Sequence, residues 1–148
     1  MQITTGIRSV LSHPAIYSAF QYLMGAKAGW TLFVQKYVRP EKGGAILDIG
    51  CGNARLRKFL SPKDIREGEY FGLDISKELI EIARKSFSKD HFFIGSMTDL
   101  PLGADNFDVV TGIASFHHLL NRKDQLRCLS EAHRVLKKDG LICLTNWK

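Results

Sequence analysis

Short apolar runs alternate with amphipathic segments from residue 45 onward. This alternation is typical of βαβ units, in which a parallel sheet carries helices on its faces. The apolar runs are nearly continuous, as expected of strands that are covered on both sides. They predict five strands, over residues 45–49, 70–73, 92–94, 107–113 and 141–145.

Amphipathic segments over residues 55–60, 77–87 and 123–136 separate these runs and predict helices. Asn121 precedes the last segment and can cap its N-terminus. Residues that suit a helix C-terminus follow it, namely Lys137, Lys138 and Gly140. Its apolar face is expected to consist of Leu126, Leu129, His133 and Leu136.

Residues 1–40 form a separate helical pattern, in which Pro14 is tolerated in a first turn and Pro40 ends the segment. Its apolar positions recur at roughly helical spacing: Ile16, Ala19, Leu23, Ala26, Trp30, Phe33 and Tyr37. Its aromatic residues include Tyr17, Phe20, Tyr22, Trp30 and Phe33. We expect them to pack against the sheet, and the alternative is a lid over a substrate or a contact with a membrane surface.

Length and composition narrow the class of protein. A chain of 148 residues with 45% hydrophobic residues predicts one domain, 1–148, made of the helical segment 1–40 and a core over 45–148. Charged residues make up 24%, which excludes a disordered chain and stable membrane insertion. The net charge of +6 favours polyanions such as RNA or an anionic membrane surface, whereas an ordinary solvated surface is the simpler interpretation.

The three cysteines, Cys51, Cys128 and Cys143, lie far apart in the sequence. Neither a disulfide framework nor a zinc site is supported, because no C-x-x-C pair or suitably spaced histidine accompanies them. No metal is expected, and a reducing cytoplasm fits these thiols. The N-terminus differs from a secretory signal, since Ser12, His13 and Pro14 interrupt its apolar stretch.

Two glycines, Gly50 and Gly52, follow the first predicted strand, and Asp74 ends the second. Glycines there let a ligand approach main-chain N–H groups at the opening of the next helix, and an acid at the second strand can bind ribose hydroxyls. A dinucleotide fingerprint needs a third glycine where Arg55 stands, and a Walker P-loop needs a G-K-S/T that is missing. The pattern favours S-adenosylmethionine, which has no pyrophosphate, over NAD.

Residues 45–145 resemble the class I methyltransferases that use S-adenosylmethionine. The resemblance rests on the glycine motif at 47–52 and on the segments 95–101, 107–110 and 133–140, which follow in the family's order and intervals. It implies a three-layer α/β fold, with a mostly parallel sheet of order 3-2-1-4-5 and helices on both faces. It also implies methyl transfer as the activity and S-adenosylmethionine as the cofactor.

The resemblance carries cofactor roles onto ten positions. The backbone of 50–52 lies under the methionine and ribose, Asp48 supports the amino end, and Asp74 binds the ribose hydroxyls. Ile75, Ser96 and Met97 are expected to contact the adenine. Ile113 and Ala114 are expected to lie beside the sulfonium. The ten residues are Asp48, Gly50, Cys51, Gly52, Asp74, Ile75, Ser96, Met97, Ile113 and Ala114. Cys51 is expected to be a packing residue that contributes only its backbone N–H.

Three departures from the family accompany this resemblance. Ala54 stands where the family has glycine, which ordinary backbone torsions would tolerate, and Ser96 stands where an acid is frequent. The family's final strand hairpin is also missing, so the fifth strand is expected to have an exposed edge. That edge suggests a homo-oligomer, a non-catalytic or truncated domain used for assembly, or a fragment of a longer enzyme.

Substrate chemistry is expected after the fourth strand, where His117 can orient or deprotonate an acceptor. A structural role for His117 and His118 is the alternative. The segments 113–119 and 131–136 are similar to methyltransferases that modify tRNA wobble uridines, which favours an RNA acceptor. Residues 1–40 instead resemble the leading helix of small-molecule methyltransferases, so both acceptor classes stay open.

Overall fold

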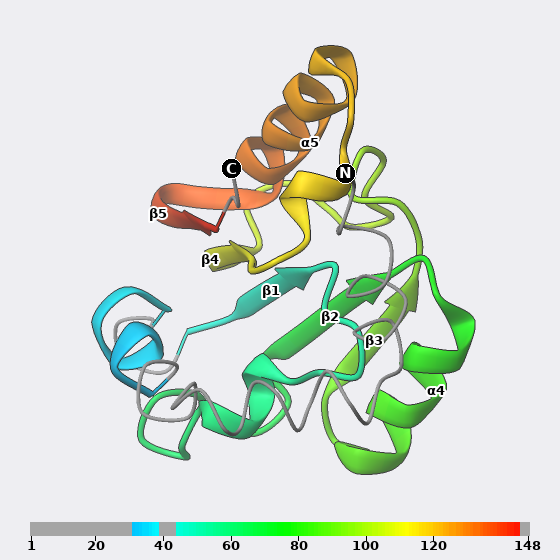
Figure 1. Cartoon of the computed structure of the whole chain (residues 1–148). Coiled ribbons are helices and arrows are strands. Elements are labelled where there is room, and N and C mark those ends of the chain that lie inside the picture. Colours follow the sequence, from blue (N-terminus) through cyan, green and yellow to red (C-terminus); the bar gives the residue numbers. More distant parts are fainter. Residues whose placement is uncertain (1–30, 39–43, 146–148) are drawn as a thin grey trace, which may run out of the picture. The chain divides into compact units, whose positions relative to one another are not determined.

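The computed structural model describes residues 31–38 and 44–145. The chain divides into two units, Met1–Phe33 and Val34–Lys148, and the sheet lies wholly within the second. Five parallel strands follow the order β3-β2-β1-β4-β5 (Figure 1), which confirms the predicted sheet. The strands are β1 (Ile46–Ile49), β2 (Tyr70–Asp74), β3 (His91–Ile94), β4 (Phe107–Gly112) and β5 (Leu136–Leu144).

Two helices match the predicted segments to within a residue, α4 (Lys77–Ser86) and α5 (Arg122–Val135). The Ser76 hydroxyl caps α4 by accepting from Leu79 N at 3.3 Å. Asn121 caps α5 as predicted, since its Oδ1 accepts from Asp124 N at 2.9 Å. These side chains satisfy N–H groups that a helix start leaves without partners.

The predicted apolar face of α5 is wrong except for Leu136, which follows the helix and is buried in the core. Leu126 and Leu129 are 56% and 37% exposed, while the buried residues of α5 are Cys128, Ala132 and Val135. These three are spaced four and three residues apart and therefore share one face of the helix. Small and β-branched side chains let α5 lie close to the sheet, so the larger leucines remain on the solvent side.

Strand β5 begins at Leu136, immediately after α5, five residues earlier than the sequence indicates. Leu136 pairs with Phe107, and regular pairing resumes only at Leu141 opposite Val109. The extra residues bulge outward, and Asp139 there has a φ of 66°. The predicted C-terminal residues of the helix, Lys137 and Lys138, therefore belong to an irregular strand.

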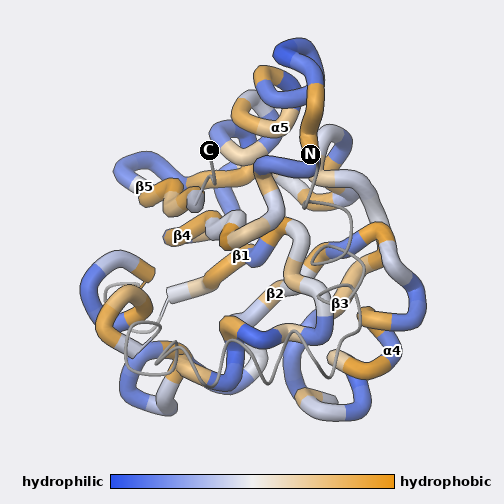
Figure 2. The backbone as a smooth tube through the Cα atoms, viewed as in Figure 1, coloured by the Kyte–Doolittle hydropathy of each residue, from blue (hydrophilic) through white to orange (hydrophobic). Residues whose placement is uncertain are grey.

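Much of the backbone of the strands is coloured as hydrophobic in Figure 2, and their buried side chains divide between the two faces of the sheet. Leu47, Leu73 and Val110 point toward α5 and form one hydrophobic cluster with its buried residues. Ile46, Tyr70 and Val109 are paired in register, so they share the opposite face, where α4 packs over β2 and β3. Helices therefore lie on both faces, as Figure 1 shows.

Most of the predicted N-terminal helix, including Pro14, Tyr17, Phe20, Tyr22 and Trp30, lies outside the described residues. Residues 31–38 are helical, and 34–38 form the π-helix η1 (Val34–Val38). Pro40, where the segment is predicted to end, lies outside the described residues. Asn146 and Trp147, beyond β5, also lie outside the description.

Candidate cofactor and acceptor site

The carboxyl ends of β1, β2 and β4 bring the predicted residues to one edge of the sheet. Gly50 and Gly52 follow β1 and have φ values of 74° and 54°, which glycine adopts without strain. Asp74 ends β2, and the loop after β4 begins at Ile113. Open α/β sheets bind ligands at this edge.

The glycine turn (residues 50–54) is held by hydrogen bonds from its own amides. Gly50 N and Cys51 N both donate to Leu73 O, at 2.7 and 3.0 Å, and Gly52 N donates to Asp74 Oδ2 at 2.8 Å. The Cys51 N–H therefore has a partner within the protein, and its contact with a ligand stays a prediction. At these positions the turn would shape the surface against which a ligand lies and let it approach the backbone closely.

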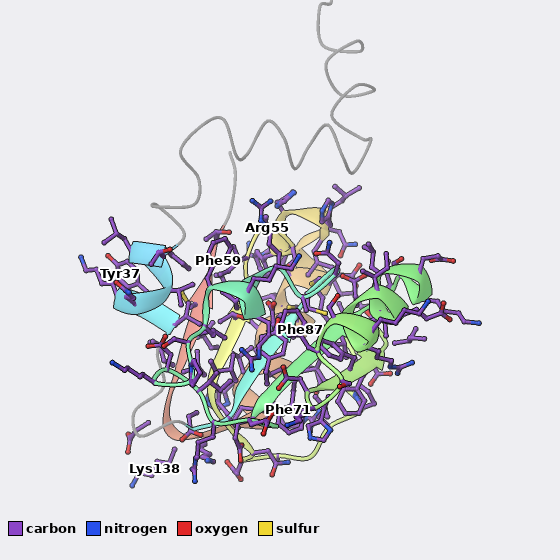
Figure 3. The ribbon with its side chains drawn as sticks, turned by 90° about the horizontal axis from the view of Figure 1, so that it is seen from below. Tyr37, Arg55, Phe59, Phe71, Phe87 and Lys138 are labelled. Carbon is purple, nitrogen blue, oxygen red and sulfur yellow. The ribbon has the colours of Figure 1, made fainter. Side chains whose placement is uncertain are left out.

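The helix after the turn is also shorter than predicted. In place of an α-helix over 55–60, the chain forms the four-residue 3₁₀ helix η3 (Leu56–Phe59), which follows Arg55 and ends at Phe59, both labelled in Figure 3. So short a helix has too small a dipole to bind an anion. A cofactor without a pyrophosphate fits this feature better than a dinucleotide does.

Two features leave room for a nucleoside. Among residues 31–38 and 44–145, a Cβ placed on Gly52 would meet only Leu79 Cδ1, at an ordinary contact distance of 3.9 Å, so no other described residue crowds the turn there. Ile75, directly after Asp74, is 77% exposed. An exposed isoleucine beside a carboxylate matches a ligand that has an apolar base and a hydroxyl-bearing sugar. The residues present therefore fit S-adenosylmethionine.

Ala54 does not have the ordinary torsions expected of it. Its φ is 60° and its side chain is fully buried. The left-handed region costs a non-glycine residue about 1–2 kcal/mol. The turn therefore keeps the backbone shape of a glycine at this position and carries the strain of an alanine.

Asp48 lies inside the sheet core and is 3% exposed. Its Oδ2 accepts from the Tyr70 hydroxyl at 2.6 Å and its Oδ1 from the Thr111 hydroxyl at 2.9 Å. Burial raises the pKa of Asp48 to about 6, against the lowering effect of the two hydroxyls and with a further increase from the Asp74 charge. Both carboxylate oxygens face the protein, so Asp48 joins β1, β2 and β4.

Ser96 and Met97 lie in the post-β3 loop (residues 95–102). Gly95 N donates to Asp74 O at 3.0 Å, which ties the start of this loop to β2. The Ser96 hydroxyl bonds Thr98 Oγ1 at 2.8 Å and closes a tight turn that ends at Asp99. A Cβ at Gly50 would lie 3.4 Å from Met97 Cε, so the loop reaches the glycine turn.

The post-β4 loop (residues 113–121) contacts the glycine turn through Ser115, which sequence reasoning missed. The buried Ser115 hydroxyl donates to Ile49 O at 2.7 Å. Ala114, with a φ of 54°, donates its N–H to Thr145 Oγ1 at 2.8 Å. No sequence motif marks Ser115 or Thr145, because their roles depend on strands that meet only in the fold.

His117 and His118 lie in the short helix η4 (Phe116–His118), with ring centroids 4.2 Å apart. His118 is exposed and His117 is half-buried. The Nδ1 atom of His117 is buried and has no hydrogen-bond partner. Desolvation, and to a smaller extent His118, lower the pKa of His117, which favours a neutral imidazole.

The cysteines are separate thiols, and burial raises the pKa of Cys51 far above its usual value. A role for Cys51 as a nucleophile therefore has no support, in agreement with its predicted packing role. Within residues 31–38 and 44–145, no group of three His, Cys, Asp or Glu side chains could hold a metal ion. No helix in that same part of the chain is long and apolar enough to cross a membrane.

Comparisons with known proteins identify the family of the chain. Residues 47–144 match the methyltransferase domain family. The chain is 32% identical, over 78% of its length, to a demethylmenaquinone methyltransferase of Lysinibacillus sphaericus, of which it covers 50%. The chain belongs to the class I S-adenosylmethionine-dependent methyltransferase family.

Solved structures show the same fold. The YcgJ protein of Bacillus subtilis is 28% identical, with a TM-score of 0.65 over 78% of this chain and 48% of that one. DesVI of Streptomyces venezuelae is similar in fold, with a TM-score of 0.75 at 22% identity, over 91% of this chain and 57% of that one. The chain spans about half the length of the curated relatives it matches.

Proposed function

We propose that the protein binds S-adenosylmethionine at the glycine turn and transfers its methyl group to an acceptor beside the post-β4 loop. The observation that carries the proposal is the room that the described residues leave beside Gly52, next to the Asp74 carboxylate and the exposed Ile75. Asp74 has oxygen lone pairs left for ribose hydroxyls, since each oxygen already accepts only one N–H, from Gly52 or Ser76.

The cofactor supplies an activated methyl group together with its leaving group. The chain's task is therefore to orient the acceptor and exclude water. We assign Ile75 to one face of the adenine, Ser96 and Met97 to its edge, and Ile113 and Ala114 to the neighbourhood of the sulfonium. His117, with its lowered pKa, takes the proton from a hydroxyl of the acceptor.

A small hydroxylated aromatic molecule is the acceptor class that we favour. The support is the similarity to demethylmenaquinone methyltransferases, whose named substrate is a quinone. The two-electron reduction of a quinone by a cellular reductant gives the quinol, which is aromatic and carries the hydroxyl that this proton transfer needs. RNA is the second candidate, because the net charge of +6 attracts a polyanion. We place the protein in the cytoplasm, which suits three separate thiols. An oligomer through β5 stays a prediction, since β5 pairs only with β4 among the described strands.

Isothermal titration with S-adenosylhomocysteine, beside NAD, tests the cofactor. We expect saturable binding of S-adenosylhomocysteine alone. Replacing Asp74 with alanine should weaken it by roughly 1.5–3 kcal/mol, because a charged acceptor is lost. Asp108→Ala is the matched control: Asp108 also accepts a backbone N–H, from Ala45 at 2.8 Å, but lies at the amino end of β4. It should lower stability and leave affinity unchanged.

Each contrary result of that titration has a definite meaning. Binding of NAD alone would make the protein an oxidoreductase candidate and end this proposal. Binding of neither ligand would favour the assembly-domain interpretation. Equal affinity in Asp74→Ala and in the original protein would place the ribose elsewhere.

The acceptor side predicts a separate effect of His117. Replacing it with glutamine should lower the rate of methyl transfer to a short-chain demethylmenaquinol by roughly 10²-fold or more, the usual contribution of a general base. Cofactor affinity should stay unchanged. Because the pKa of His117 is lowered, the imidazole stays neutral at lower pH than an ordinary histidine does. The rate of the unmodified protein should therefore decrease only when the pH falls below the usual histidine pKa of 6.5. His118→Gln is the control, and an equal loss in both variants would indicate a structural role for the pair.

A further inference from the structure

Glu131 and Arg134 form a two-point ion pair near the end of α5. Arg134 Nε donates to Glu131 Oε1 at 2.8 Å and Nη2 donates to Oε2 at 2.7 Å. This geometry is the strong, planar form of an arginine–carboxylate contact. The Arg134 hydrogen bond is the main reason that the pKa of Glu131 falls to about 2. The pair therefore stays charged throughout the neutral range.

The same two side chains hold the post-β3 loop, more than thirty residues away in sequence. Glu131 Oε2 accepts from Leu100 N at 2.8 Å. Arg134 donates to Leu100 O at 3.1 Å and to Leu102 O at 2.8 Å. One N–H and two carbonyls of an irregular segment are thus fixed by a single pair. A loop without regular structure has few other means of satisfying its backbone.

The loop held in this way carries Ser96 and Met97. Its first residue is tied to β2 by the bond from Gly95 N to Asp74 O, and its last residues are tied to α5 by the ion pair. Between these two attachments lies the Ser96–Asp99 turn, with Met97 reaching the glycine turn. The position of the turn therefore depends on both attachments.

We propose that Glu131 and Arg134 are positioning residues for the adenosine part of the cofactor, acting through the post-β3 loop. The inference rests on the proposed function, because it takes Ser96 and Met97 as adenine contacts. Neither side chain touches the cofactor in this scheme. Their contribution is to order the loop before binding, so that the ligand does not bear the entropy cost of ordering it.

The test compares two conservative replacements of arginine. Arg134→Lys keeps the positive charge and loses the planar guanidinium that makes two hydrogen bonds to Glu131. Arg57→Lys is the matched control, since Arg57 also donates to a carboxylate, Asp90 Oδ2 at 2.6 Å, and to a carbonyl, Leu60 O at 3.2 Å. The Arg57 guanidinium also lies 5.5 Å from the Phe87 ring, labelled in Figure 3, just beyond α4. Asp90 directly precedes β3 and so lies at the amino ends of the strands, opposite the carboxyl ends where the candidate site lies.

Calorimetry is run with S-adenosylhomocysteine and with 5′-methylthioadenosine, which lacks the amino-acid part. Arg134→Lys should raise both dissociation constants by the same factor, about tenfold, as expected when a preordered loop is loosened. Arg57→Lys should leave both unchanged. Amide hydrogen exchange over residues 95–102 should quicken only in Arg134→Lys. If that variant does not fold by circular dichroism, Glu131→Gln replaces it.

Unchanged affinity in the Arg134 variant, beside an original protein that binds, would overturn this inference alone. A loss for S-adenosylhomocysteine but not for 5′-methylthioadenosine would also overturn it, because the effect would not pass through the adenosine. An original protein that binds neither ligand would overturn the proposed function and this inference together.

Discussion

Replacing Gly50 with alanine is expected to destabilise the fold by roughly 3 kcal/mol, the sum of left-handed backbone strain and overpacking. Gly50 has a φ of 74°, and an added Cβ would lie 2.3 Å from Ser115 Cβ and 2.9 Å from its Oγ. Ser115 cannot swing away cheaply, because it is buried and its hydroxyl is bonded to Ile49 O. Urea unfolding monitored by circular dichroism measures the loss.

The Gly52→Ala variant separates the cost of left-handed backbone strain from the cost of the steric clash with Ser115. Gly52 also has a positive φ, 54°, but the one described side chain that its added Cβ would meet is Leu79, whose Cδ1 lies 3.9 Å away. We therefore expect a cost of about 1–2 kcal/mol, from the backbone alone. The double variant Gly50→Ala with Ser115→Gly removes the clashing side chain and should recover part of the loss. If Gly50→Ala proved no less stable than Gly52→Ala, the proposed packing between the two loops would be wrong.

The fold was predictable because its signals are local. Mostly apolar runs such as 107–113 are typical of strands covered on both faces, as in a parallel sheet, and Asn121 marks a helix start by its own chemistry. The face of α5 was not predictable in this way. Its leucines recur at helical spacing, yet the face that packs against the sheet carries the smaller side chains of Cys128 and Ala132. The distance between the helix and the sheet decides which side chains are buried, and the sequence does not give that distance.

The candidate site likewise contains residues that the sequence identifies and residues that only the folded structure reveals. Gly50, Gly52 and Asp74 could be found from sequence, since the turn torsions and the strand-end carboxylate leave a recognisable pattern. Ser115 and Arg134 could not. A serine and an arginine are common on surfaces, and their partners at Ile49 and Leu100 are revealed only when the chain is folded.

The buried carboxylate of Asp48 predicts a pH dependence of stability. Its pKa is raised from 3.8 to about 6, so the folded protein binds this proton more tightly than the unfolded chain does. The stabilisation is fully present below pH 3.8 and is lost as the pH rises through about 6. This group alone should lower the free energy of unfolding by about 1.3 kcal/mol between about pH 5 and 7, and by roughly 3 kcal/mol in total.

Asp48→Asn should remove that slope, because an amide cannot ionise and can still accept from one of the two hydroxyls, Tyr70 or Thr111. The comparison is best made above about pH 5, since the low pKa of Glu131 adds an opposite dependence: its stabilisation is lost as the pH falls from 4.5 through about 2. Asp64→Asn, at a second buried aspartate bonded to Ser61, is the control and should leave the Asp48 slope in place. An unaltered slope in Asp48→Asn would mean that the pKa of Asp48 is not raised in the folded protein and that another group causes the pH dependence.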